Sequence, residues 1–529
     1  MTRRILRTGI YLLLGLPVLL LLAIAGGLAW VNSESGRATV ARLAADAVPG
    51  LTIEGLHGPL PSRLGIGRLV MADADGPWLE LEDAEVALDL MALLGRQARV
   101  TALTARRVAL HRLPPSTEPA PPPDPDAPLI PALPSLPVDL RLDRLAVDRI
   151  ELGAPVTGVA AVLSAEGEAL YAAGRLSARL EARRLDAPAE ARLSLNLAPG
   201  ADRLQARLEA REPPGGLVAT MLGQPDHATE ALLTLDGPAS GARLDLRASV
   251  GADITLTANG EVRAAPDGAA GARLAINLAA APLLPEDLRA IAMPVAIDLD
   301  AAIDAGQRVA LRRLDLRAPA ARLSAEGSAD LAASTVDVAL RLEAGGSASL
   351  GTLVPDAARW EALRAEARAT GRMDAPTVTL DLAPEGFGSA IPQVVAALGA
   401  APRLSLRATL PDRIETLTLD GTALHVTAEG GVGETLDATL RATVSDLAPL
   451  VPGLAGGLQA ELRATGPRSN PSLALTAQGE RLEREGQVVE GLALDLRVAT
   501  PLSAPRAEGT LRATYAGLPA RPTRRDLRG

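Results

Sequence analysis

The sequence predicts a mainly β fold: an elongated, repetitive sheet of antiparallel type, preceded by one transmembrane helix. Three observations predict it. Apolar and polar residues alternate with period two over most of the chain after residue 50, one short strand motif returns several times, and an uncharged apolar run lies near the N terminus. A period of two gives each strand one apolar and one polar face, because successive side chains point to opposite sides.

Composition narrows the function classes. The chain has 529 residues, of which 48% are hydrophobic, so low hydrophobicity does not predict disorder. The formal net charge of −10 argues against nucleic acid as a partner, since nucleic-acid-binding surfaces are basic. The chain contains no cysteine, which excludes disulfides and thiolate metal sites.

The apolar run covers residues 10–31 and is predicted to be a transmembrane anchor. At 1.5 Å per residue it would reach roughly 33 Å, close to the thickness of a bilayer core. The side chains expected to hold the anchor are Tyr11, Leu12, Leu19, Leu22, Trp30 and Val31. The arginines that precede the run are expected to keep residues 1–9 in the cytoplasm by the positive-inside rule: Arg3, Arg4 and Arg7.

A cleaved signal peptide is the alternative interpretation of this segment. Ala23-Ile-Ala25 followed by Gly26 resembles a cleavage site. The apolar run continues beyond this point to Val31, which favours an uncleaved anchor. Under either interpretation the rest of the chain is exported, and we expect a single-pass inner-membrane protein with a periplasmic body.

The body is expected to have three parts. Residues 32–113 should form a helix and an N-terminal β region, residues 114–137 a Pro-rich linker, and residues 138–529 a repetitive β-rich region. The helix is predicted by four apolar residues at helical spacing, with Ser33 or Ser35 as its cap and the Pro-Gly pair at 49–50 as its stop. The four residues are Val40, Leu43, Ala44 and Ala47.

The repeated motif is an apolar residue, Ser or Thr, Ala, any residue and Gly. It ends at Gly167, Gly260, Gly327, Gly430 and Gly479. We expect these glycines to supply the positive φ of tight turns. A longer pattern at residues 363–371 returns at 458–466, which indicates internal duplication. Short helical inserts are predicted near 285–292, 356–367 and 392–399.

No arrangement of residues predicts catalysis or metal binding. The four histidines stand apart in the sequence, and neither a G-x-S-x-G elbow nor a P-loop is present. The acidic residues are scattered along polar strand faces. We therefore predict a protein that is not an enzyme, with no catalytic, cofactor-binding or metal-binding residues and no cofactor.

The apolar strand faces are the remaining candidate site. A sheet curled over one apolar face would form a groove able to bind alkyl chains, at about 0.8 kcal/mol per buried methylene. The candidate lining residues are Leu163, Ile254, Leu256, Leu323, Val426, Leu473 and Leu475. The alternative is that this face closes on itself as the core of a sandwich or barrel, and periodicity does not separate the two.

Several segments after the anchor carry a family resemblance. They are Gly50-Leu-Thr-Ile-Glu-Gly-Leu-His-Gly-Pro-Leu60, Ile66-Gly-Arg-Leu-Val-Met-Ala-Asp-Ala-Asp-Gly-Pro-Trp78, and the stretches 87–96, 108–114, 136–142 and 211–223. This set is similar to the N-terminal region of the TamB family, the translocation and assembly module subunits of the AsmA-like, bridge-like lipid transfer group. The resemblance covers about residues 1–300.

The resemblance implies a β-taco, an open curled sheet with an apolar groove, anchored in the inner membrane and extending through the periplasm. It implies a role in outer-membrane protein and autotransporter assembly and in secretion. Its implied partners are phospholipids and the outer-membrane barrel protein TamA or related assembly factors. Family members are usually longer, so the C-terminal family domain is expected to be missing here.

The function hypothesis is phospholipid transfer along the groove between the inner and outer membranes. A second hypothesis is a chaperone-like scaffold, whose sheet edges bind outer-membrane client strands by β-augmentation without moving lipid. An exported enzyme and a purely structural envelope repeat protein are further alternatives.

Overall fold

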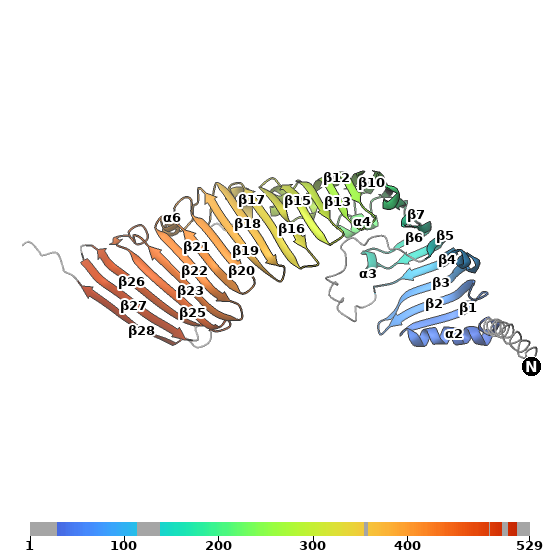
Figure 1. Cartoon of the computed structure of the whole chain (residues 1–529), viewed down its shortest axis with the longest axis horizontal. Helices are drawn as coiled ribbons and strands as arrows, with labels where there is room; N and C mark the ends of the chain where they lie inside the picture. The colour runs from blue at the N-terminus through green and yellow to red at the C-terminus, as the bar shows by residue number, and fades with distance from the viewer. Residues whose placement is uncertain (1–28, 114–137, 354–357, 486, 500–505, 516–529) are drawn as a thin grey trace, which may run out of the picture. The chain divides into compact units, whose positions relative to one another are not determined.

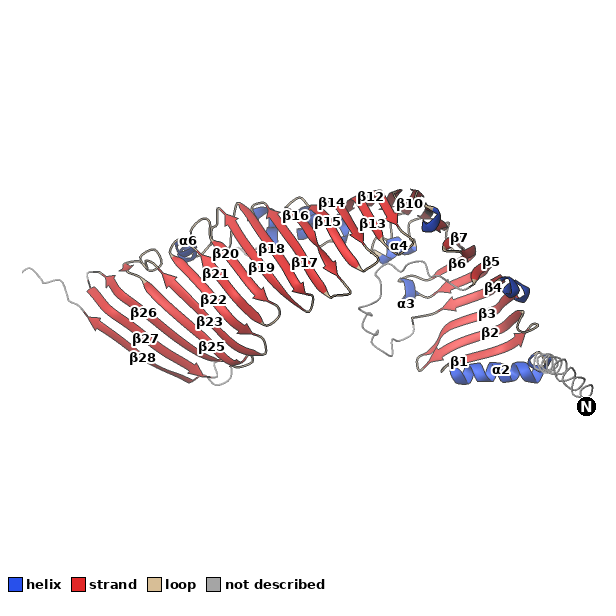
Figure 2. Ribbon diagram, in the orientation of Figure 1, coloured by secondary structure: helices blue, strands red, loops and turns tan. Residues whose placement is uncertain are grey.

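The computed structural model describes residues 29–113, 138–353, 358–485, 487–499 and 506–515. Within them the fold is mainly β, as predicted, with 28 strands (Figure 1). The chain divides into two compact units, unit 1 before residue 272 and unit 2 from residue 272 onward. The helices α3 to α6 and η1 to η4 lie in connections between consecutive strands (Figure 2). Their bounds are η1 Leu90–Gly95, α3 Ala154–Thr157, η2 Pro199–Ala201, α4 Leu217–Met221, η3 Ala281–Leu283, α5 Glu286–Ala292, η4 Ser347–Leu353 and α6 Pro392–Leu398.

The predicted helix after the anchor is confirmed as α2, Glu34–Ala47. Ser33 is its N-cap, and the Ser33 hydroxyl accepts a hydrogen bond from the Gly36 N–H at 3.1 Å. The helix packs along the edge strand β1 (Figure 2). It therefore covers the first edge of the unit 1 sheet, where unpaired backbone groups could otherwise recruit another strand.

Unit 1 is built from long strands, each paired with its neighbours in the sequence. Twelve strands lie wholly in unit 1. After the first strand, ten of the remaining eleven run antiparallel to the strand before them. They are β1 Leu51–His57, β2 Arg63–Asp73, β3 Gly76–Asp89, β4 Gln97–Leu110, β5 Asp139–Leu152, β6 Ala161–Ala172, β7 Arg175–Arg184, β8 Glu190–Ala198, β9 Arg203–Glu212, β10 Thr229–Gly237, β11 Ala242–Val250 and β12 Ile254–Ala264. Strand β13, Ala270–Ala280, contains the boundary between the units.

The pair β4 and β5 departs from the antiparallel prediction, because these two strands are parallel. A parallel pair requires the connecting chain to return along the length of the strand before the next one begins. Here that connection includes the Pro-rich segment 114–137, which lies outside the described residues. The linker prediction for this segment stays a prediction.

Unit 2 continues the antiparallel pattern through its hairpins. Its strands are β14 Val295–Ile303, β15 Arg308–Arg317, β16 Ala321–Asp330, β17 Thr335–Ala344, β18 Ala362–Arg372, β19 Ala375–Glu385, β20 Arg403–Thr409, β21 Arg413–Asp420, β22 Leu424–Val432, β23 Thr435–Val444, β24 Leu454–Ala455, β25 Leu458–Pro467, β26 Ser472–Arg484, β27 Gln487–Ala499 and β28 Arg506–Tyr515. The two copies of the longer repeat begin equivalent hairpins, β18–β19 and β25–β26, in agreement with internal duplication.

Two of the three predicted helical inserts are confirmed, as α5 and α6. The third, at 356–367, is wrong over its described part, because residues from Ala362 belong to strand β18. Its sequence alternates apolar and charged residues, and pairing with β17 and β19 decides in favour of the strand.

The turn interpretation of the motif glycines is also wrong. All five lie inside strands, and Gly327 and Gly430 have φ of +154° and +129° there. A Cβ at Gly327 would lie 2.2 Å from the Asp337 carbonyl oxygen of the next strand. On the other side, Gly327 pairs with Leu311, beside a bulge at residues 312–313 of β15. Gly430 is placed in the same way, since its partner Ile414 borders a bulge in β21 and a Cβ there would lie 2.1 Å from the Asp437 carbonyl oxygen. Gly327 and Gly430 therefore let neighbouring strands approach closely beside a bulge.

The predicted anchor, residues 10–31, lies outside the described residues except for its last three. Trp30 and Val31 belong to a helical turn just before α2, and Trp30 is 52% exposed. None of the helices in the described part of the chain has the length and apolar character needed to cross a bilayer.

Candidate functional site

Three continuous rows of apolar side chains cross unit 2 on one face of its sheet. Directly paired residues on neighbouring strands share a face, so the strand register defines each row. The first row contains the predicted residues Leu323 and Val426: Leu316, Leu323, Leu342, Ala365, Leu382, Leu404, Leu419, Val426, Ala442 and Ala460. The rows beside it contain Leu475 and Leu473.

The row through Leu475 is made of leucines with three alanines among them. It consists of Leu314, Ala325, Leu340, Ala367, Leu380, Leu406, Leu417, Ala428, Leu440, Leu462 and Leu475. The row through Leu473 runs through Leu311, Gly327, Val338, Ala369, Val378, Ala408, Ile414, Gly430, Ala438 and Ala464. The register thus places all four predicted residues of unit 2 on one apolar face.

Bulges keep this face apolar where the spacing of the sequence changes. In β15, Leu311 and Leu314 are three residues apart, yet both face the apolar side because residues 312–313 bulge. The same device recurs in β21 between Ile414 and Leu417. In each case polar residues occupy the bulge, so the extra residue does not turn a charge onto the apolar face.

Unit 1 carries an equivalent apolar face. Its central row crosses β7 to β11 as Leu180, Leu193, Leu208, Leu233 and Leu246. The predicted Leu256 lies on the same face in a neighbouring row of alanines. Leu163 and Ile254 lie at strand ends, where Leu163 pairs with Arg184 and Ile254 with Val250.

Solvent reaches the middle of both apolar faces. Leu180 and Leu340 are each 37% exposed, and Leu440 is 38% exposed. Within the described ranges no large side chain falls below 2% exposure. A closed sandwich or barrel core would bury such central leucines almost completely. The sheet is therefore open, which resolves the alternative that the sequence left unsettled.

The two charged residues at one end of the unit 1 apolar face are satisfied locally. The Arg184 guanidinium donates to Asp186 at 2.9 Å and 3.1 Å, and its side chain is only 6% exposed. This hydrogen bond lowers the pKa of Asp186. Glu212 accepts a hydrogen bond from the Val218 N–H at the start of α4, at 3.0 Å. Neither charge is left facing the leucine rows without a partner.

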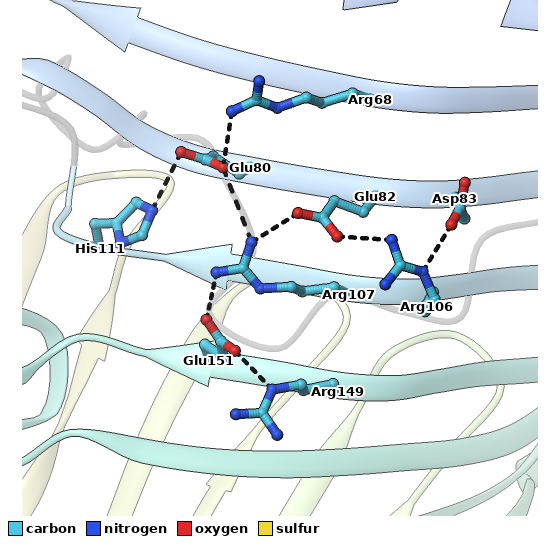
Figure 3. A network of polar contacts seen from close by, with 9 residues as sticks. All are labelled: Arg68, Glu80, Glu82, Asp83, Arg106, Arg107, His111, Arg149 and Glu151. Carbon is cyan, nitrogen blue, oxygen red and sulfur yellow. Dashed lines mark hydrogen bonds and ion pairs between the residues drawn. The ribbon is translucent and has the colours of Figure 1, made fainter. Parts of the chain in front are cut away.

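The opposite face carries ladders of ion pairs. Figure 3 shows the ladder on β2 to β5, in which Arg107 donates to Glu82 on β3 at 2.8 Å and to Glu151 on β5 at 2.5 Å. Arg149 also donates to Glu151, at 2.6 Å. These hydrogen bonds, with that from Arg107 the largest cause, hold the pKa of Glu151 at about 2.

In unit 2, Asp315 is the most enclosed member of such a ladder. It is 3% exposed and accepts hydrogen bonds from Arg322 at 2.8 Å, Arg317 at 3.0 Å and Arg313 at 3.2 Å. The bond from Arg322 is the largest cause of the strongly lowered pKa of Asp315. Three cations around one buried carboxylate stabilise the sheet and leave that carboxylate with no open side for a substrate.

The polar face of unit 1 has a hollow of about 1020 Å³ over β4 to β10. Two of the arginines that line it, Arg179 and Arg207, are paired with Glu168 and Glu209. We assign no ligand to this hollow. Across the described part of the chain, no group of His, Asp and Glu side chains forms an arrangement that could hold a metal ion.

Sequence reasoning missed the central leucine rows and the ion-pair ladders. Both depend on which residue of one strand lies beside which residue of the next, and period-two alternation fixes the face but not that register. The anchor residues Tyr11, Leu12, Leu19 and Leu22 and the arginines of residues 1–9 lie outside the described residues.

These observations define a class of protein: a β-sheet protein with one long apolar face that is open to solvent and an opposite face covered by paired charges. Residues 20–162 match the family model described as TamB, N-terminal domain. The N-terminal part of this chain is therefore similar to a TamB N-terminal domain, and this match supports the resemblance found in the sequence over α2, β1 to β5 and the start of β6. No curated protein matches the chain.

Proposed function

We propose that this protein is held in the inner membrane by residues 10–31 and carries phospholipid along its apolar face, in support of outer-membrane protein assembly. The observation that carries the proposal is the solvent access of the central leucines, which the described residues leave uncovered. The match to the TamB N-terminal domain supports a role in the translocation and assembly module. Our proposal extends that role to autotransporter assembly and protein secretion.

The dimensions of the apolar face suit an acyl chain. Half of a hydrocarbon core of about 30 Å gives about 15 Å for one acyl chain, which covers roughly three strands spaced about 4.8 Å apart. The row through Leu475 crosses the strands from β15 to β26, so the face of unit 2 has room for several acyl chains in succession. Each methylene that leaves water contributes about 0.8 kcal/mol.

The side chains of the apolar face also suit a moving ligand. Leucine, alanine and valine offer area without directional contacts, so a lipid gains similar free energy at each position along a row. The ion pairs lie on the opposite face, where they cannot hold a headgroup beside the leucine rows. Nothing in this mechanism requires catalysis, and we propose a protein without enzymatic activity.

Photo-crosslinking in cells tests the proposal. A crosslinking residue at Leu256 or Leu323 should capture phospholipid, whereas one at Thr255, which faces the opposite side of β12, should not. Phospholipid adducts at Thr255 alone would contradict the proposal. Adducts with outer-membrane client proteins in place of lipid would favour the chaperone-like scaffold.

The outer-membrane partner is part of the same proposal. We propose TamA or a related assembly factor as the partner that the module supplies. Co-purification of a barrel protein with the full chain from solubilised envelopes would support this partner, and its absence from crosslinked complexes that do contain phospholipid would argue against it.

A further inference from the structure

We propose that the turn η1 is a second membrane contact, which lies on the bilayer surface beside the point where the chain leaves its anchor. This inference rests on the membrane anchoring proposed above and goes beyond it. The contact is formed by Met91, Leu93 and Leu94, which are 73%, 52% and 80% exposed. We call these three residues the apolar tip.

The apolar tip is held by a formed turn. The Asp89 carboxylate accepts hydrogen bonds from the Met91 N–H at 3.1 Å and the Ala92 N–H at 3.3 Å. At the other end, Arg96 has φ of +60° and its N–H donates to the Leu93 carbonyl at 3.0 Å. The turn is capped at both ends, so its apolar side chains are presented to solvent by defined structure and not by an unstructured loop.

A chain of hydrogen bonds links the apolar tip to the exit of the anchor. The Asn32 side chain donates to the Leu60 carbonyl at 2.8 Å and accepts from the Leu60 N–H at 2.7 Å. Two residues further along the same loop, the Ser62 carbonyl accepts from the Leu88 N–H at 2.6 Å. Leu88 lies two residues before η1 begins at Leu90.

The apolar tip and the start of α2 therefore lie at the same end of the strands β1 to β4 (Figure 1). Neighbouring strands are about 4.8 Å apart, so η1 lies within roughly two to three strand spacings of residue 32. Residue 32 directly follows the segment that we propose to cross the bilayer. The bilayer is consequently the nearest structure into which the apolar side chains of the tip could insert.

The size of the tip favours lipid over protein as the occupant. A stable protein interface buries about 800 Å² on each partner, which three side chains do not supply. A bilayer contact needs far less, because the anchor already holds the tip at high effective concentration beside the membrane.

The charges around the tip also agree with a lipid occupant. Asp89 caps the turn and pairs with Arg99 at 3.5 Å, so the carboxylate nearest to the tip is compensated within the protein.

The chain offers a matched control for this contact. Met221 in α4 is 67% exposed and also belongs to a short apolar turn in unit 1. It lies between β9 and β10, at the opposite end of the strands from η1, as the register of β4 to β10 shows. The absence of cysteine allows a single fluorophore to be placed at either position without background.

The experiment uses the full chain in phosphatidylcholine vesicles that contain a nitroxide-labelled lipid as quencher. An environment-sensitive fluorophore is attached to Met91→Cys, to Met221→Cys, or to Leu19→Cys within the anchor segment. We expect quenching at position 91 to exceed that at position 221 by about threefold or more, as for a side chain inserted at the interface. In the Met91→Cys background, Leu93→Ser with Leu94→Ser should remove most of the quenching at position 91.

Three results would overturn the inference. Quenching at position 19 without quenching at position 91 would leave the anchor in place and assign the apolar tip to a protein partner. Equal quenching at positions 91 and 221 would mean that exposed apolar turns meet the vesicles without preference. No quenching at either 19 or 91 would overturn the anchor and the second contact together.

Discussion

The exposure of the central leucines predicts how a thiol placed among them will react. Leu340 in β17 is 37% exposed, whereas Leu204 in β9 is 4% exposed, although both lie on apolar strand faces. Leu340→Cys and Leu204→Cys are the same substitution in two different environments. The chain has no cysteine of its own, so each variant carries a single thiol.

The two thiols should differ by orders of magnitude in reactivity. A thiol at position 340 keeps roughly a third of its surface in water and should react within about tenfold of the rate of a free thiol. A thiol at position 204 reacts when the structure opens locally, and an opening free energy of about 4 kcal/mol would slow it by about a thousandfold. Arg341→Cys, on the polar face of β17 with a side chain 69% exposed in the native residue, provides the fast reference.

The assay is the rate of modification by a water-soluble maleimide, measured on the delipidated full chain and again after phospholipid is added. We expect the addition of lipid to slow the reaction at position 340 and leave that at position 341 unchanged. A thiol at 340 that reacts as slowly as the one at 204 in the delipidated chain would refute the open face, because that protection requires a covering layer.

Three further predictions concern the framework of the sheet. Glu151→Gln should lower the free energy of unfolding by about 1 kcal/mol at pH 7, since the charged partner of Arg107 is lost. The pKa of Glu151 is about 2 in the folded chain and about 4.3 in the unfolded chain, so the difference from wild type should shrink as the pH falls from about 4.5 through 2. Acid-unfolding curves measure this difference, and a difference that persists at pH 2 would contradict this account. Gly327→Ala should push β16 away from β17 and lower the free energy of unfolding by about 3 kcal/mol or more, seen as faster hydrogen exchange in both strands. Gly371→Ala should have a smaller effect, because nothing lies within 4 Å of the new Cβ. Equal effects of the two substitutions would show that the close approach at Gly327 is unimportant. Asn32→Ala should cost about 1–3 kcal/mol and speed hydrogen exchange in α2 and β1, and unchanged exchange there would show that this side chain does not hold the helix to the sheet.

The sequence was sufficient to predict the class of fold and the identity of the apolar face. Alternation with period two assigns each side chain to one side of its strand, whatever the strand pairs with, so Leu256 and Leu323 could be placed on the apolar face in advance. The helix α2 was predictable for a similar reason, since the Ser33 cap and the Pro-Gly stop act within a few residues.

What could not be predicted depends on contacts between strands. The row through Leu340 and Leu440 exists because of register, which is set by turns and bulges along the whole sheet. Gly327 was expected in a turn because a positive φ is common there, and its place opposite a bulge depends on the neighbouring strand. Whether the apolar face was open or closed also lay beyond the sequence, because the same alternation serves both.

The central claim, that the apolar face is the path of phospholipid, is tested most directly by blocking that path and following lipid through it. Leu340→Asp with Leu440→Asp places two carboxylates on the central row of unit 2, where desolvating a charge costs several kcal/mol. Ala339→Asp with Thr439→Asp places the same charges on the polar face of the same strands. The measurement is the rate at which pulse-labelled phospholipid reaches the outer membrane in cells that depend on this protein, with equal amounts of each folded variant. We predict a loss of about tenfold or more for the first pair and a rate near wild type for the second. A wild-type rate for the first pair would contradict the claim.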